Sequence, residues 1–149
     1  MKQLNVALIG AGFMGKAHSL AYVAMPMFFH PAPAYPVRKT IVDVNEAVAA
    51  DAAIRFGFEK SSGDWHSVIN DPEIDIIDIA TPNHLHAEIA IAAAAAGKHI
   101  ISEKPLARSG AEAKTMYDAV KKAGIAPEQF AGGHGSTGKY ADLAALDGK

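Results

Sequence analysis

The sequence predicts an α/β fold built on a doubly wound parallel sheet with helices on both faces. Two observations support this prediction. Short apolar runs alternate along the chain with longer segments of helical character, and the first run leads directly into glycines spaced G-x-G-x-x-G. Consecutive parallel strands need right-handed crossovers through helices. We therefore expect the strand order 3-2-1-4-5, with a sixth strand that is weak or absent.

Length and composition describe one globular domain. The chain has 149 residues, of which 50% are hydrophobic and 20% are charged, and its formal net charge is −2. This charge balance argues against a non-specific nucleic-acid partner. The absence of cysteine excludes a disulfide framework and a thiolate metal site. The sequence shows neither a signal peptide nor an apolar stretch of membrane-spanning length, so we expect a cytoplasmic protein without a membrane partner.

The N-terminal part of the chain predicts two strands joined by a helix and a long loop. Residues 4–9 are nearly all apolar, as in strands buried on both faces, and residues 14–24 continue as a helix. Four prolines fall within residues 25–36, so we expect a loop there, because proline is excluded from helix interiors and central strands. The second strand is expected at residues 37–44.

The middle of the chain predicts a helix, a short strand and a second, shorter helix. Asn45 can cap a helix over residues 46–56, which a glycine follows. Residues 58–60 are expected as the third strand. Asp64 can cap a helix over residues 65–70, before an Asp-Pro pair ends it.

The next segments complete the alternation of strands and helices. Residues 74–80 and 98–102 are expected as the fourth and fifth strands, because both runs are largely apolar. Between them, residues 84–96 are rich in alanine, the strongest helix former. The last helix is expected over residues 110–123, with Ser109 as its cap and an acidic residue at its third position.

The pattern weakens after residue 124. Residues 125–130 form a poor strand that a proline interrupts, residues 131–139 are predicted to be loop, and residues 140–146 have the length of one or two helical turns. We therefore assign residues 1–124 to the α/β domain and residues 125–149 to an atypical tail. A sheet without a sixth strand exposes an edge, and exposed edges tend to pair, so we expect self-association into a homo-oligomer.

The glycine-rich turn predicts a dinucleotide-binding, or Rossmann, domain. Gly10 permits the tight turn out of the first strand, Gly12 lets phosphates approach the main chain, and Gly15 lets the new helix pack closely. Phe13 and Met14 open that helix, where free N–H groups and the helix dipole favour an anion. The alternative, an ordinary strand-to-helix turn, is weaker because of the strand and helix on either side.

Asp43 is the candidate for binding the adenosine ribose. It ends the second strand, farther beyond Gly15 than the usual ~20 residues, because the proline-rich segment lengthens the connection. A carboxylate there accepts from both ribose hydroxyls and repels a 2′-phosphate, which favours NAD over NADP. The alternative is a solvated side chain or a cap for the next helix. Asn45 lies two positions further on, so dual specificity stays open.

Two further segments follow strands at the same edge of the sheet. Thr81, Pro82 and Asn83 come directly after the fourth strand, where parallel sheets bind ligands. Glu103 and Lys104 end the fifth strand, and a half-buried lysine there could donate to a substrate hydroxyl or carbonyl. The alternative for this pair is an exposed charge pair before a proline turn.

Two histidines belong to the first of these segments. His84 and His86 could simply be exposed residues at a helix start. They share no helix face and no nearby carboxylate completes a ligand set, so we expect no metal site.

Three segments, read together, resemble the N-terminal half of the Gfo/Idh/MocA oxidoreductases, which include glucose–fructose oxidoreductase and inositol dehydrogenase. They are residues 10–18, residues 81–86 and residues 96–106, in this order and with fitting spacing. The resemblance covers about residues 1–124. It implies a Rossmann domain that holds NAD or NADP, and hydride transfer between nicotinamide and a carbon of a sugar or polyol substrate.

The resemblance also implies roles for particular residues. Asn83 and His86 would line the nicotinamide side of the cofactor. Glu103 and Lys104 would reach the nicotinamide ribose and the substrate, with Lys104 the catalytic residue that this chain supplies.

The tail departs from the family pattern. Members of the family continue with a large substrate domain, and residues 125–149 do not resemble it. A fragment, a truncated product and an engineered domain are all compatible with this ending, and so is a non-catalytic dinucleotide-binding or interaction module. Residues 133–140 approach a P-loop, but Tyr140 stands where Ser or Thr would hold Mg²⁺, so we favour a flexible polar tail.

Overall fold

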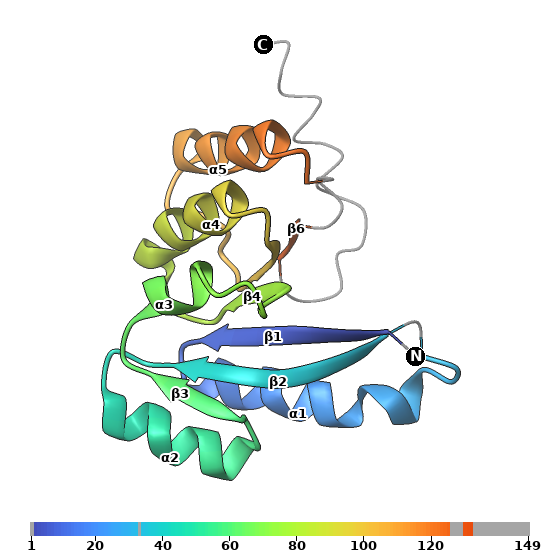
Figure 1. Ribbon diagram of the computed structural model, residues 1–149. Helices are drawn as coiled ribbons and strands as arrows, with labels where there is room; N and C mark the ends of the chain where they lie inside the picture. Colours follow the sequence, from blue (N-terminus) through green and yellow to red (C-terminus); the bar gives the residue numbers. More distant parts are fainter. Residues whose placement is uncertain (1, 33, 126–129, 133–149) are drawn as a thin grey trace.

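A parallel sheet with the strand order β3-β2-β1-β4-β5-β6 forms the centre of the computed structural model, which describes residues 2–32, 34–125 and 130–132 (Figure 1). Its first five strands follow the predicted order 3-2-1-4-5, so the predicted fold class is confirmed. The strands are β1 (Gln3–Ile9), β2 (Tyr35–Val42), β3 (Lys60–Ser62), β4 (Ile76–Ile79), β5 (His99–Ser102) and β6 (Phe130–Gly132).

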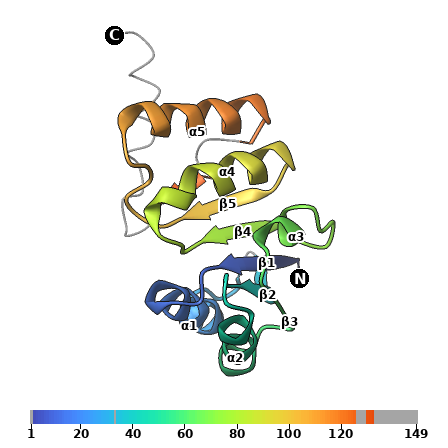
Figure 2. The same cartoon turned by 90° about the vertical axis from the view of Figure 1, so that its left-hand side faces the viewer.

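The helices cover both faces of this sheet. Helices α1 and α2 lie on one face, and α3, α4 and α5 lie on the other, as two perpendicular views show (Figures 1 and 2). The helices are α1 (Phe13–Phe28), α2 (Glu46–Phe56), α3 (Trp65–Ile69), α4 (His86–Ala95) and α5 (Gly110–Lys122), with a short 3-10 helix, η1 (Asn83–Leu85), before α4. Within the described ranges, no helix is long and apolar enough to cross a membrane.

The sixth strand, which we predicted to be weak or absent, is a strand of only three residues. β6 pairs in parallel with β5, from Ile100 opposite Phe130 to Ser102 opposite Gly132. The prediction of loop from residue 131 is therefore wrong for residues 131 and 132. A strand this short is held by backbone pairing with its neighbour and needs no apolar run of its own. The remaining tail predictions, including the P-loop-like segment at 133–140, lie outside the described residues.

Two prolines lie inside regular elements, where we predicted a loop. Pro26 lies near the C-terminal end of α1, whose last turn closes with a hydrogen bond from the Phe29 N–H to the Met25 carbonyl. Pro36 lies in β2 opposite Leu4 of β1. β3 pairs with β2 only from Thr40 onward, so the first part of β2 has a neighbour on one side alone, where proline removes no ladder hydrogen bond.

The capping residues that we predicted are confirmed. The Asn45 side chain accepts hydrogen bonds from the N–H groups of Ala47 and Val48, and the Asp64 and Ser109 side chains accept from the first turns of α3 and α5. The third strand starts at Lys60 rather than at residue 58, because the Phe58 side chain is buried against α2 instead.

Side chains alternate between two cores along the strands. Ile77 and Ile79 of β4 belong to the core under α3, α4 and α5, whereas Leu8 of β1 belongs to the core under α2. Asp78 lies between the two isoleucines, pairs with Leu8 across the sheet and is fully buried. A carboxylate therefore lies in the middle of the sheet, on the face that α1 covers.

Candidate functional site

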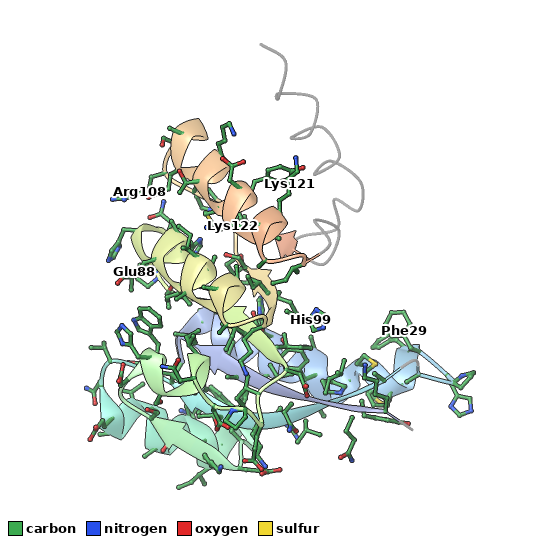
Figure 3. All side chains as sticks on the ribbon, turned by 45° about the horizontal axis from the view of Figure 1, so that its top comes forward. Phe29, Glu88, His99, Arg108, Lys121 and Lys122 are labelled. Carbon is green, nitrogen blue, oxygen red and sulfur yellow. The ribbon has the colours of Figure 1, made fainter. Side chains whose placement is uncertain are left out.

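The loops that follow β1, β2, β4 and β5 meet at one edge of the sheet. Figure 3 shows Glu88 and Arg108, just beyond the β4 and β5 loops, at one end of the domain, and His99 and Phe29 at the other. Backbone hydrogen bonds tie the strand ends together. The N–H of Gly10 donates to the Val42 carbonyl at 2.7 Å, and the N–H of Ala80 donates to the Ile9 carbonyl at 2.8 Å.

Two of the three motif glycines are required by the fold itself. Gly10 has a φ of +108°, and a Cβ atom there would lie 2.5 Å from the Ala80 carbonyl oxygen. A Cβ atom on Gly15 would lie 2.0 Å from the Gly10 carbonyl oxygen. Any larger residue at either position would push the start of α1 away from the strand ends.

Gly12 has no such structural reason to be glycine. A Cβ atom there would meet nothing within 4 Å, and its φ of −72° suits any residue. Gly12 is the N-cap of α1, offers no side-chain acceptor, and no acidic residue follows in the first turn. The N–H groups of this turn are therefore available to an anion. Phe13 is exposed and Met14 is partly buried beside them.

Asp43 lies beside the glycine loop, as its predicted role requires. Its carboxylate accepts a hydrogen bond from the Ala11 N–H at 3.2 Å and another from the Asn45 N–H at 3.0 Å. The cap of α2 is Asn45 itself, so Asp43 is not that cap. Binding of a ribose by Asp43 stays a prediction.

Thr81 presents the clearest sign of a missing polar partner. Its hydroxyl oxygen is buried, and within the described part of the chain it is the one buried side-chain N or O atom without a hydrogen-bond partner. Leaving such a group unpaired costs about 1–3 kcal/mol. Thr81 lies against the glycine loop, since its backbone N is 3.1 Å from where a Cβ of Gly10 would be. A dinucleotide fits this edge, because it would supply a polar group here and phosphates at Gly12.

The residues after Thr81 separate into exposed and buried ones. Pro82 and Asn83 are exposed, and so is His84. His86 is 1% exposed, and its ring nitrogens lie 2.9 Å from the Thr81 carbonyl oxygen and 3.0 Å from the Pro105 carbonyl oxygen. The His86 ring thus lies between the two segments that follow β4 and β5, and its place on the nicotinamide side of a cofactor stays a prediction. Among the described residues, no group of three or more metal-ligating side chains is arranged to hold a metal ion.

Glu103 and Lys104 differ sharply in exposure. Glu103 is buried, its carboxylate lies 2.8 Å from the His18 ring, and its other oxygen accepts from the Lys104 N–H at 3.0 Å. Lys104 is exposed, which for this residue agrees with the alternative that the sequence left open. It follows the end of β5, where none of the described elements covers it.

Three residues that sequence reasoning gave no role form a partly buried polar cluster with Glu103. His18 Nδ1 lies 2.9 Å from an Asp78 carboxylate oxygen, and the Tyr22 hydroxyl donates to the same oxygen. The hydrogen bond to Asp78 is the main cause that raises the pKa of His18 to about 9, and the charge of Asp78 and the contact with Glu103 add to it while burial opposes it. Burial, followed by the charge of Asp78, raises the pKa of Tyr22, so this hydroxyl stays protonated.

A signal for this cluster was present in the sequence. Asp78 is one of two aspartates, with Asp75, in the largely apolar run that predicts the fourth strand. His18 and Tyr22 are four positions apart on the predicted first helix, so they share one face. A buried carboxylate needs donors, and the helix that packs over its strand is the nearest source.

Comparison with known proteins identifies a family whose sequence model this chain matches. Residues 4–126 match the sequence model of an oxidoreductase family described by an NAD-binding Rossmann fold, Gfo/Idh/MocA. Levoglucosan dehydrogenase from Pseudarthrobacter phenanthrenivorans is 72% identical over 125 residues, which are 84% of this chain and 32% of that protein. The scyllo-inositol 2-dehydrogenase (NAD(+)) of Bacillus subtilis is 34% identical over 83% of this chain and 34% of its own length.

Solved structures agree with these relatives. A levoglucosan dehydrogenase in complex with NADH and levoglucosan superimposes with a TM-score of 0.79 and 73% sequence identity, over 80% of this chain and 32% of that chain. The chain therefore spans about a third of the length of the relatives that it matches.

The raised pKa of His18 predicts a pH dependence of stability. The folded state binds the His18 proton more tightly than the unfolded state does. The contribution of His18 to the free energy of unfolding is therefore fully present below the ordinary pKa of 6.5 and is lost as pH rises through about 9. Denaturant unfolding at a series of pH values should therefore show stability falling across this window. His18→Gln should flatten that part of the curve, while His66→Gln, which changes an exposed histidine paired with Asp64, should leave it intact. A wild-type curve without this slope would contradict the assignment.

Proposed function

The chain belongs to the Gfo/Idh/MocA oxidoreductase family, and from that premise we propose that it binds a nicotinamide dinucleotide, preferably NAD, at the carboxyl edge of its sheet. The observation that carries the proposal is the buried, unpartnered hydroxyl of Thr81 beside the glycine loop. The open space over Gly12 supports it, because a phosphate could reach the helix N–H groups there.

The proposed contacts follow the order of the strands. Gly12, Phe13 and Met14 would donate backbone N–H groups to the pyrophosphate. Asp43 would accept from the adenosine ribose hydroxyls, and its charge would repel a 2′-phosphate. On the nicotinamide side, the proposed residues are Thr81, Pro82, Asn83, Glu103 and Lys104.

We propose that the protein containing this domain is a dehydrogenase of a sugar or polyol. When bound, the nicotinamide would take a hydride from, or give one to, a carbon that bears a hydroxyl or carbonyl oxygen. The exposed ammonium of Lys104 is positioned by the end of β5 and would donate a hydrogen bond to that oxygen. The structure supports this role by leaving Lys104 uncovered at the edge where the other loops meet.

A second candidate is a domain that binds the dinucleotide without completing a reaction. The two candidates share the cofactor site and differ in turnover, so binding and hydride transfer must be measured separately.

Gly12→Val should remove dinucleotide binding while leaving the fold intact. A Cβ atom at this position would meet nothing within 4 Å, and the valine side chain would occupy the space proposed for the phosphates. We expect NADH affinity to fall by roughly 100-fold, the equivalent of one or two hydrogen bonds to a charged group. Calorimetric titration with NADH measures it.

The matched control for this change is Gly110→Val. Gly110 also stands at a helix start in open space, so its variant should bind NADH as the wild type does. Wild-type protein that is folded but binds neither NAD(H) nor NADP(H) would refute the proposed function.

Asp43→Asn should reduce the preference for NAD. The amide keeps the size of the side chain and an acceptor for the Ala11 N–H, but it loses the charge that favours the ribose hydroxyls. We expect roughly tenfold weaker NAD binding and unchanged or tighter NADP binding. Asp51→Asn, at an exposed site on α2, is the control. Equal losses for both dinucleotides would remove the ribose role.

Lys104→Ala should abolish any hydride transfer that the chain performs. Removing a group that hydrogen-bonds to the reacting oxygen costs about 10²–10⁴-fold in rate. Formation of NADH from NAD, followed with levoglucosan and with inositols as substrates, measures it. Lys114→Ala is the control, because Lys114 is an exposed lysine that pairs with Asp118 along α5. Wild-type binding without turnover would favour the second candidate.

A further inference from the structure

His18 connects the helix that starts at the glycine loop to the turn that carries Lys104. We propose that His18 is a positioning residue, which holds Lys104 in place through the carboxylate of Glu103. The inference rests on the proposed function, because it assigns Lys104 to the edge where the dinucleotide and the substrate would meet. It concerns a residue for which the sequence motif predicts no role of its own.

The connection consists of consecutive short contacts. Asp78 lies 2.9–3.0 Å from Nδ1 of His18 through both of its carboxylate oxygens. Nε2 of His18 lies 2.8 Å from one oxygen of Glu103. The other oxygen of Glu103 accepts from the backbone N–H of Lys104 at 3.0 Å. These contacts therefore fix the position of the Lys104 backbone relative to Asp78 in the buried centre of the sheet.

This chain of contacts requires His18 as an imidazolium. Asp78 and Glu103 present carboxylate oxygens to the two ring nitrogens, and both nitrogens can donate only when both carry a proton. The groups that face His18 are Asp78 from β4, Glu103 from the end of β5 and Tyr22 from α1 itself, whose hydroxyl donates to Asp78. With a pKa of about 9, His18 carries the second proton at neutral pH.

The position of His18 along α1 relates its contact with Glu103 to the proposed phosphate site. Gly15 fixes the start of α1 against Gly10, and His18 lies one turn further along the same helix. The N-terminal end of α1 is proposed to bind the pyrophosphate, and its next turn holds Glu103. One rigid helix thereby sets the distance between the phosphate site and Lys104.

The inference predicts that Lys104 responds to the protonation of His18. When the imidazolium loses a proton, one of its two carboxylate contacts loses its donor, and the turn after β5 is held less tightly. Binding of NADH should then weaken as pH rises through about 9. The group of the cluster that loses its charge in this range is His18, which is not proposed to contact the dinucleotide itself.

Nuclear magnetic resonance of the wild-type chain tests the connection without a variant. Near neutral pH, both ring nitrogens of His18 should carry protons. The backbone amide signal of Lys104 should shift with the same midpoint as the His18 ring, at about 9, while the amide of Ala93, buried in α4, should not. A His18 titration that the Lys104 amide does not follow would overturn the inference.

NADH affinity in variants tests the consequence. His18→Gln cannot form an imidazolium, so we expect roughly tenfold weaker NADH binding near neutral pH, equal to the loss of one hydrogen bond to a charged group. Its affinity should not fall further through pH 9, and the wild type should approach the same value there. A purely structural role would weaken binding at every pH by the same factor.

The matched control is His66→Gln, in which an exposed histidine that also contacts an aspartate is changed. It should keep the wild-type affinity and pH profile. Equal affinity and an equal pH profile for His18→Gln and wild type would overturn the inference alone. A wild-type chain that binds no NADH would refute the proposed function instead, and the resonance titration would still decide the role of His18.

Discussion

Burial of the Asp78 carboxylate is the constraint on which the rest of the site depends. A charged group without partners in the interior costs several kcal/mol, and Asp78 is fully buried in the centre of the sheet. The donors that satisfy it, His18 and Tyr22, come from α1. The rotation of α1 about its axis is therefore fixed, and with it the direction in which its N-terminal N–H groups point. A requirement of folding thus orients the part of the helix proposed to bind phosphate.

The motif glycines divide into two classes when the structure is compared with the sequence. Gly10 and Gly15 are explained within this chain, because a Cβ atom at either would collide with backbone. Gly12 is not, and we propose that it is explained by the dinucleotide. The same three-glycine motif therefore combines positions required for folding with a position proposed for binding. Substitutions at the first kind should lower stability, and substitutions at the second should lower NADH affinity.

Much of the fold could be predicted from the sequence, because its signals are local. Asn45, Asp64 and Ser109 cap the helices that they precede, and apolar runs mark the central strands in the predicted order. The errors arose where distant neighbours decide the outcome. Pro36 is tolerated in β2 because β3 is too short to reach it, and β6 forms because β5 offers a free edge.

The candidate site shows the same division. The loops at the sheet edge follow from strand order alone, so Asp43, Thr81 and Glu103 could be located in advance. The environment of each side chain could not. His86 and Glu103 are buried and Lys104 is exposed, and each of these results depends on packing between elements far apart in the sequence.

The position of the His86 ring has a consequence for the cost of ligand binding. With its two ring nitrogens 2.9 Å and 3.0 Å from the Thr81 and Pro105 carbonyl oxygens, the buried ring packs between the segment after β4 and the segment after β5 and connects them. Loops that are tied together in this way lose their conformational entropy when the chain folds, so little remains to be lost when a ligand arrives. The edge of the sheet is in this sense preorganised, and its affinity would come from contacts rather than from closure.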